Sequence, residues 1–189
     1  MNKPKKALVI VDVQPTFCEG GSLPVEGGNE VAREIATYVV QDERYDCIIT
    51  TQDWHIDPGA HFSDQPNYQE TWPAHGVAGT DEANLHPELS KIRGKINYSL
   101  KKGMFEAAYS GFEGRDGEES LEQILSKESI ETVDIVGLAF DHCVKATAID
   151  SAQNGFKTRV LTKLTAAVSP DNVSVVSKEM TAHGIEVVS

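Results

Sequence analysis

Runs of consecutive apolar residues alternate with amphipathic segments along most of the chain. Ala7 to Val11 is a continuous run rich in β-branched residues, and Cys47 to Thr51 is a second one. Runs that are apolar on successive residues are typical of strands buried on both faces, as in a parallel sheet. Shorter strands are predicted at 95–98, 132–136, 159–162 and 186–188.

Most of the segments between these strands have the periodicity of a helix. Asn29 is a favoured N-cap residue, and it can start a helix that runs to about Val40. A second helix begins at Cys143, and Gly155 is well placed as its C-terminal cap. Further helices are predicted at 120–126 and 171–182. This alternation predicts an α/β fold, a doubly wound and mostly parallel sheet with helices on both faces, in a single domain spanning 1–189.

The stretch 52–91 lacks clear periodicity and is rich in Pro, Gly, His and aromatic residues. Loops of this length are uncommon inside a compact domain and are usually functional. In parallel sheets, ligands bind beyond the carboxyl ends of the strands. Asp12, Asp53 and the segment 137–143 each follow a predicted strand. We therefore expect the fold to bring these three together at one end of the sheet.

Composition narrows the classes of partner. The 189-residue chain carries a formal net charge of −12, so its surface repels phosphate backbones and nucleic-acid binding is not expected. Its three cysteines are irregularly spaced, which indicates no disulfide framework and a reducing compartment. The apolar run near the N-terminus is too short for a signal peptide or a membrane span. We therefore expect a cytoplasmic protein that contacts no membrane, either a monomer or a homo-oligomer.

Cys143 is the candidate nucleophile. At a helix start, free N–H groups and the helix dipole stabilise a thiolate and can hold an oxyanion. The alternative is a buried small apolar residue, which is also our interpretation of Cys18 and Cys47. A thiol nucleophile needs a base, for which Asp12 is the candidate, although it could instead cap a loop. Lys102 could place a cation between them, but composition alone favours a solvated lysine.

One acid and three histidines gather in the long loop. These residues are Asp53, His55, His61 and His75. A carboxylate with neutral imidazoles suits a divalent ion such as zinc, iron(II) or manganese, with open positions for water or substrate. The alternative is a set of hydrogen-bonding loop histidines. The spacing is not that of a zinc finger, so the pattern leaves the identity of the metal open.

With these residues in view, the chain resembles the nicotinamidases, also called pyrazinamidases, of the isochorismatase-like cysteine hydrolase family. The resemblance runs almost from end to end. It rests on ordered matches at Val-Asp-Val-Gln 11–14, Asp-Trp-His 53–55, His-Phe-Ser 61–63, Trp-Pro-Ala-His 72–75, Gly-Thr-Asp 79–81, Leu-His-Pro 85–87, Lys-Gly 102–103, Ala-Tyr-Ser-Gly-Phe-Glu-Gly 108–114 and Asp-His-Cys-Val 141–144. So many matches in the same order are not expected between unrelated sequences.

The resemblance implies an amidohydrolase that converts nicotinamide to nicotinate and ammonia through a cysteine thioester, as part of NAD salvage. Pyrazinamide should also be cleaved. The implied site residues are a triad of Asp12, Lys102 and Cys143, an oxyanion hole at Ala139 and Cys143, substrate contacts at Phe17, Trp72, Tyr109 and His142, and metal ligands at Asp53, His55, His61 and His75. It also implies a non-proline cis peptide at Leu138–Ala139. Whether His61 binds the metal directly stays open.

Three other functions compete with this interpretation. Another hydrolase of the same fold could act on a vinyl ether or a carbamoyl amide, but a metal anchor for a ring nitrogen has no purpose there. A non-catalytic metal- or ligand-binding member of the fold would need no nucleophile, yet Asp12, Lys102 and Cys143 are all present. A metallohydrolase with a purely structural Cys143 is the third alternative, and thiol alkylation would separate it from the cysteine mechanism.

Overall fold

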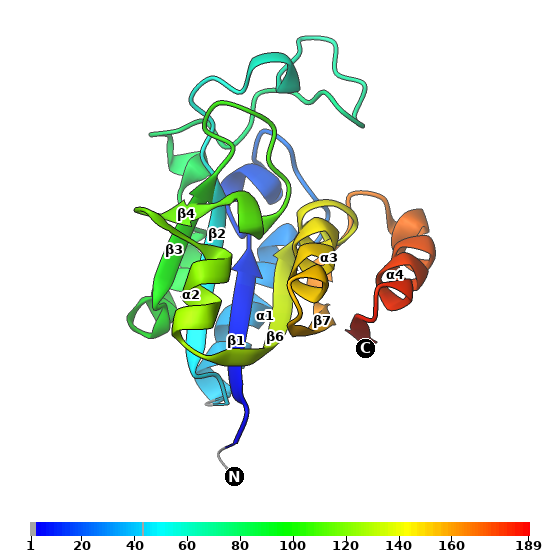
Figure 1. Cartoon of the computed structure of the whole chain (residues 1–189). Helices are drawn as coiled ribbons and strands as arrows, with labels where there is room; N and C mark the ends of the chain where they lie inside the picture. Colours follow the sequence, from blue (N-terminus) through cyan, green and yellow to red (C-terminus); the bar gives the residue numbers. More distant parts are fainter. Residues whose placement is uncertain (1–2, 43) are drawn as a thin grey trace.

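Eight strands form one sheet in the residues that this computed structural model describes, 3–42 and 44–189. The strand order is β5-β4-β3-β2-β1-β6-β7-β8 (Figure 1). All neighbours pair in parallel except β3 with β4 and β4 with β5. The predicted α/β fold with a mostly parallel sheet is therefore confirmed.

Most elements overlap their predicted ranges, but β3 shares only Tyr98 with the predicted strand 95–98, and β4 and β5 were not predicted. The strands are β1 (Lys5–Val11), β2 (Cys47–Asp53), β3 (Tyr98–Lys102), β4 (Arg115–Asp116), β5 (Glu119–Ser120), β6 (Ile130–Leu138), β7 (Lys157–Ala166) and β8 (Glu186–Val188). The helices are α1 (Gly28–Gln41), α2 (Leu121–Lys127), α3 (Lys145–Gln153) and α4 (Val173–Ala182), with a 3₁₀ helix η4 (Pro87–Lys95) and a π-helical turn at Phe140–Val144. None of the helices in the described ranges has the length and apolarity needed to cross a bilayer.

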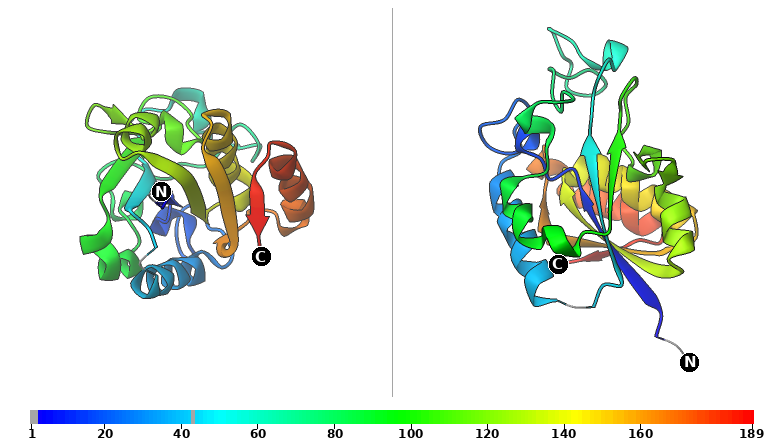
Figure 2. Two further views of the ribbon diagram at one scale, coloured as in Figure 1. Left: turned by 60° about the horizontal axis from the view of Figure 1, so that its bottom comes forward. Right: turned by 90° about the vertical axis from the view of Figure 1, so that its left-hand side faces the viewer.

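Helices cover both faces of the sheet (Figure 2). Side chains alternate along β1, so Val9 joins the core under α2, α3 and α4, whereas Leu8 and Ile10 join the core under α1 and η4. Both faces are therefore dry, which is why the central strands are continuously apolar in sequence.

The start of α1 differs from the prediction. Its N-cap is Gly27, in the left-handed region with φ 86°, and Asn29 lies inside the first turn. The carboxylate of Glu19 accepts hydrogen bonds from the backbone N–H groups of Gly27 at 2.7 Å and Asn29 at 2.9 Å. A side chain from the preceding loop thus satisfies the helix start, so the prediction of Asn29 as the cap was wrong. Gly155, with φ 86°, does follow the C-terminus of α3 as predicted.

Strand β2 extends further toward the carboxyl edge than its apolar run suggested. The predicted strand at 95–98 was misplaced, because Lys95 still belongs to η4 and β3 starts only at Tyr98. Parallel pairing between β2 and β3 places Asp53 beside Lys102, the last residue of each strand. Asp53 therefore ends β2, whereas the sequence pattern had placed it just after the strand. The first part of the long segment between these two strands lies beyond the same edge of the sheet (Figure 1), and its last part, η4, returns to pack on a face of the sheet.

Candidate active site

A narrow pocket opens at the carboxyl edge of the sheet. The predicted substrate contacts Phe17, Trp72, Tyr109 and His142 all line it, together with Ala139 and Cys143. It is also lined by aliphatic residues that the sequence argument missed, namely Leu23, Val25, Ala108, Leu138 and Val168. Such side chains carry no chemical signal in a sequence, and only the fold shows which of them face the pocket.

The ammonium group of Lys102 lies at the centre of the candidate catalytic residues. Its Nζ is 3.0 Å from Asp12 Oδ2 and 3.6 Å from Cys143 Sγ. It also pairs with Asp53 Oδ1 and donates to the carbonyl oxygen of Ala108 at 2.8 Å. Only 1% of the Lys102 surface is exposed. The structure thus brings together all three members of the predicted triad around one buried cation.

Burial and mutual charge shift the pKa of each of these groups. Burial acts to lower the pKa of Lys102, but the charges of Asp12, Asp53 and Cys143 hold it well above its usual range. Burial raises the pKa of Asp12, and the nearby Lys102 only partly offsets this. For Asp53 burial is outweighed, since the charge of Lys102 and the neighbouring His55 and His75 hold its pKa well below the usual range. Asp53 is therefore a permanent anion, whereas Asp12 is suited to exchange protons.

Asp12 is held in an unusual backbone conformation. Its φ is 48°, in the left-handed region, directly after β1. Its N–H donates to Thr51 O at 3.1 Å, and the Thr51 hydroxyl donates to Asp12 Oδ1 at 2.7 Å. Thr51 therefore occupies one carboxylate oxygen, which leaves Oδ2 facing Lys102. Strained backbone at the end of a strand is often associated with function.

Cys143 lies in the π-helical turn that precedes α3, with 8% of its surface exposed. The helix therefore starts a few residues earlier than predicted. Thr147 holds this turn, since its hydroxyl donates to Cys143 O at 2.7 Å and accepts from Gly111 N–H at 2.9 Å. The predicted cis peptide at Leu138–Ala139 is present. Burial raises the pKa of Cys143 well above its usual range despite Lys102, so the resting thiol is protonated and not the thiolate expected for a helix start.

Aromatic side chains form one wall of the pocket. The indole Nε1 of Trp72 donates to Tyr109 OH at 3.0 Å. The Trp72 and His142 rings meet edge to face with centroids 5.2 Å apart, and Tyr109 stacks on His142 at 6.5 Å. A flat ring entering this pocket would meet π-systems whose positions are already fixed by contacts with each other.

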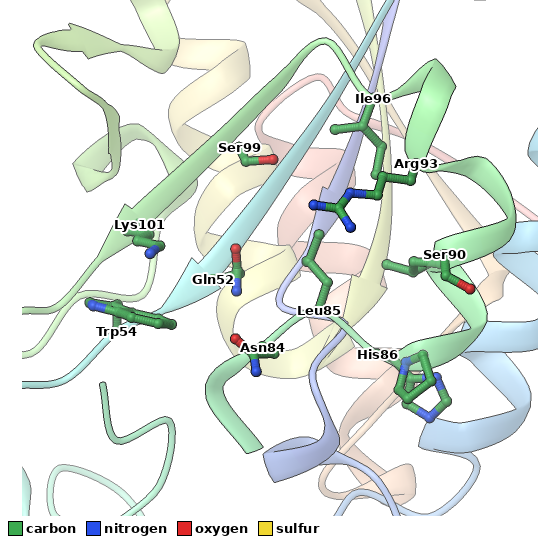
Figure 3. A pocket seen from close by; sticks show the side chains of 12 residues that line it. Gln52, Trp54, Asn84, Leu85, His86, Ser90, Arg93, Ile96, Ser99 and Lys101 are labelled. Carbon is green, nitrogen blue, oxygen red and sulfur yellow. The ribbon is translucent and has the colours of Figure 1, made fainter. Parts of the chain in front are cut away.

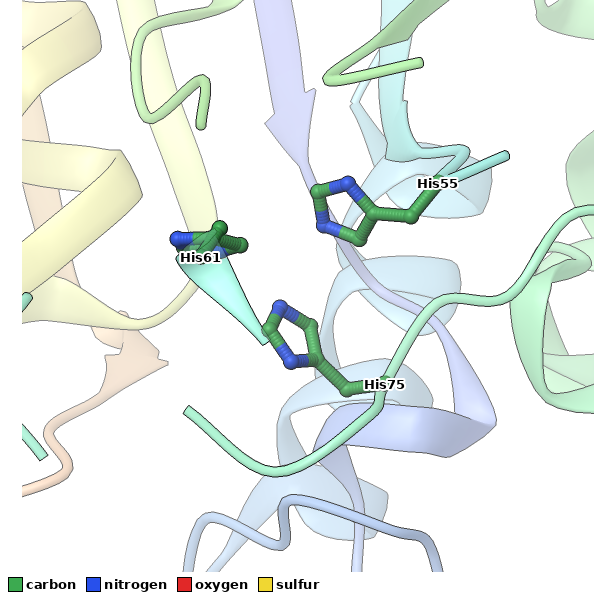
Figure 4. A group of neighbouring side chains, drawn as sticks. All are labelled: His55, His61 and His75. Atoms are coloured by element: carbon green, nitrogen blue, oxygen red, sulfur yellow. The ribbon is translucent and has the colours of Figure 1, made fainter. Parts of the chain in front are cut away.

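Three buried histidine rings converge next to this wall (Figure 4). Ligand atoms of His55, His61 and His75 all lie within 4.8 Å of one another. His55 Nδ1 lies 2.5 Å from Gly103 O, and His75 Nδ1 lies 2.7 Å from Pro73 O. Since a carbonyl only accepts, these Nδ1 atoms carry the protons and each Nε2 keeps its lone pair for a metal.

The remaining polar atoms also fit a divalent ion. Asp53 Oδ2 lies 3.4 Å from His55 Nε2 and 3.6 Å from His75 Nε2. His55 Nε2 and His61 Nδ1 are buried without a hydrogen-bond partner among the described residues. Burial, together with His75 and His55, lowers the pKa of His61 to about 4, so its imidazole is neutral near pH 7. Buried imidazole nitrogens without partners are costly unless they bind something, and a metal ion would satisfy them.

Comparison with known proteins agrees with this geometry. The isochorismatase domain model matches residues 6–189. The chain belongs to the isochorismatase family. Within this family it is 46% identical to the nicotinamidase/pyrazinamidase of Mycobacterium tuberculosis, over 97% of this chain and 98% of that protein.

Solved structures of a nicotinamidase and a pyrazinamidase show the same fold. Yeast nicotinamidase bound to the inhibitor nicotinaldehyde superposes with a TM-score of 0.84 and 30% identity, covering 97% of this chain and 99% of that one. The pyrazinamidase of Pyrococcus horikoshii in complex with zinc has a TM-score of 0.78 and 31% identity, covering 98% and 99%. These matches confirm the predicted family, and the zinc complex is consistent with metal binding by the histidine cluster.

Proposed function

We propose that this isochorismatase-family protein is a nicotinamidase that hydrolyses nicotinamide to nicotinate and ammonia and also cleaves pyrazinamide. The observation that carries the proposal is the position of Lys102 Nζ, 3.0 Å from Asp12 and 3.6 Å from Cys143 Sγ, at a pocket that also borders the histidine cluster. The 46% identity to a nicotinamidase/pyrazinamidase supports the same substrate class. The reaction would serve NAD salvage.

The substrate ring would be held between aromatic residues and the metal site. Phe17, Trp72, Tyr109 and His142 line the pocket and suit the faces and edges of a pyridine. A divalent ion held by Asp53, His55, His61 and His75 would supply a coordination position that anchors and orients the ring nitrogen. These residues leave the choice among zinc, iron and manganese open.

Asp12 begins the reaction as a general base. It accepts the thiol proton of Cys143 as the sulfur attacks the amide carbon, and Lys102 stabilises the negative charge that passes through this cluster. The raised pKa of Asp12 makes it a better base than an ordinary carboxylate. The N–H groups of Ala139 and Cys143 would hold the tetrahedral oxyanion, an effect worth about 3–4 kcal/mol per donor in comparable sites.

Asp12 then returns the proton to the amide nitrogen, so that ammonia leaves and the acyl group stays on Cys143 as a thioester. A water molecule that gives a proton to Asp12 attacks the thioester carbon. Nicotinate departs, and the thiol regains its proton. One carboxyl group thus serves both halves of the cycle, and no other base is needed.

The proposed partners are small molecules alone. The net charge of −12 disfavours nucleic acid, and we place the enzyme in the cytoplasm, without contact with a membrane.

Substitution of the nucleophile tests the thioester route. Cys143→Ala should abolish ammonia release from nicotinamide while circular dichroism and the unfolding midpoint stay close to wild type. Cys18→Ala is the matched control, because Cys18 is buried away from the pocket and should retain turnover. Undiminished ammonia release by the folded Cys143→Ala protein would exclude the thioester mechanism.

A further inference from the structure

A second hollow, of about 510 Å³, lies between β2, β3 and η4 (Figure 3). Gln52 and Lys101 are partners in the β2–β3 register, one position before Asp53 and Lys102. Side chains alternate across a strand, so Gln52 and Lys101 point to the face opposite the reaction pocket. The hollow is therefore separate from the site described above, although it is built on the same two strands.

The lining of this hollow is cationic in an acidic protein. It contains Arg93 and Lys101 but no aspartate or glutamate, although the chain has 29 acidic residues. Neither cation forms an ion pair with any residue in the described ranges. His86 adds no charge, because burial lowers its pKa and its Nε2 contacts Asn29 Oδ1 at 2.9 Å. Two positive groups therefore face one concavity whose lining holds no acidic side chain.

The side chains of Lys101 and Arg93 both have defined positions in the hollow. Lys101 Nζ lies over the Trp54 indole, 3.5 Å from the ring centroid, and this contact restrains the ammonium group. The Arg93 guanidinium extends from η4 into the hollow toward the strands (Figure 3). A guanidinium presents paired N–H donors that match the two oxygens of a carboxylate.

Apolar and neutral polar groups complete the hollow. Leu85 and Ile96 contribute aliphatic surface on the side of the hollow nearer η4, and the Trp54 indole lies on the opposite side, next to Lys101 (Figure 3). Gln52 lines the floor with only 6% of its surface exposed, and its Nε2 donates to Ala83 O at 2.8 Å. A concave site with apolar walls and a few fixed polar groups is the usual form of a small-molecule site.

We propose that this hollow is a second binding site, for a small organic carboxylate whose apolar body is about the size of one ring. The carboxylate would bind the Arg93 guanidinium, with Lys101 adding attraction across the hollow, and the apolar body would pack on Leu85 and face the Trp54 indole. Acetate and inorganic phosphate are also anions but lack a ring-sized apolar body, so they should bind more weakly than such a carboxylate. The proposal does not depend on nicotinamide hydrolysis.

The two tryptophans of the chain allow each pocket to be observed separately, since Trp54 lines this hollow and Trp72 lines the reaction pocket. Titration with benzoate, followed by the indole N–H signals in ¹⁵N-resolved NMR spectra, should shift the Trp54 signal in a saturable way. The signal is assigned with Trp54→Phe. Arg93→Ala should weaken the benzoate affinity measured at Trp54 at least tenfold.

Lys91→Ala is the matched control, because Lys91 is also a cation on η4 but pairs with Glu88 outside the hollow. It should leave the benzoate affinity unchanged. Three results would overturn the proposal: an unchanged benzoate affinity at Trp54 in Arg93→Ala, an equal affinity for acetate, or a benzoate response confined to Trp72. Loss of a dimer on Arg93→Ala substitution, seen by sedimentation, would assign the hollow to a second copy of the chain and would overturn it as well.

Discussion

Lys102 forms a buried ion pair with Asp53. Lys102 belongs to the proposed triad and Asp53 lies beside the histidine cluster, so this pair connects the two groups. The same ammonium group contacts Asp12 at 3.0 Å. Without this cation, the buried carboxylates of Asp12 and Asp53 would repel each other with no counter-charge between them. One lysine therefore stabilises both the proposed base and a proposed metal ligand.

Replacement of Lys102 by methionine should harm stability and activity together. Removal of one partner from a buried ion pair typically costs about 3–5 kcal/mol, because the remaining charge is left uncompensated. We also expect turnover to fall roughly 10²–10⁴-fold, the usual contribution of acid–base catalysis. Urea unfolding and ammonia release would measure the two effects. Lys127→Met, at an exposed surface pair, should change neither, and a fully active Lys102→Met enzyme would contradict the proposed role.

Loss of a histidine from the cluster should release the metal. His55→Ala removes a buried Nε2 that has no partner other than the proposed ion. Metal content should fall, and metal affinity should drop by more than the roughly 10–100-fold that loss of an outer partner costs. The KM for nicotinamide should rise at least about tenfold, since the ring loses its anchor.

His86→Ala is the control for this measurement, because His86 lies outside the cluster and contacts Asn29. It should retain its metal in elemental analysis. Full activity of a demonstrably metal-free protein would remove the anchoring role of the cluster.

The dependence of kcat/KM on pH should have an acid limb and no alkaline limb below about pH 9. Asp12 must be ionised to accept a proton, and burial raises its pKa above the ordinary 3.8, so activity is lost as the pH falls through that raised value. The pKa of Lys102 is held well above 10.5 and that of Cys143 well above 9.0, so neither loses its proton in the neutral range. Initial rates from pH 4 to 9 at saturating metal would check this. A rate that declines as the pH rises above 7 would contradict the assignment.

Asp141 is a positioning residue that the sequence argument did not single out. Its carboxylate accepts N–H bonds from Val168 and Ser169, both at 2.9 Å, and this ties the turn of Cys143 to the wall that contains Val168. Asp141→Ala leaves two N–H groups without acceptors, and we expect a loss of about 1–3 kcal/mol in unfolding free energy.

The catalytic effect of Asp141 should also be measurable. Misplacement of the Val168 wall should raise KM more than it lowers kcat. Asp141→Asn keeps one acceptor oxygen and should recover part of both losses. Equal kinetics for the alanine and asparagine variants would show that the carboxylate does not position the pocket.

Much of the fold could be predicted because its signals are local. The run Ala7 to Val11 is short, rich in β-branched residues and apolar on successive residues, which is typical of a strand buried on both faces. The histidines between 55 and 75 lie close in sequence, so a metal-binding group could be expected before their rings were seen to converge. The order of strands and helices likewise determined the fold class.

Other features depend on contacts between distant segments, which no local pattern encodes. The pairing of Lys102 with Asp53 follows from the β2–β3 register, and the cap of α1 comes from Glu19, not from Asn29. The protonated state of Cys143 is likewise a property of burial, because the cost of desolvating a thiolate depends on everything packed around it. The sequence by itself determined which chemical groups the protein has and which strands are dry. Tertiary structure alone decided which of these groups lie close enough to form ion pairs and to shift each other's pKa, because electrostatic energies depend on distances in space and not along the chain.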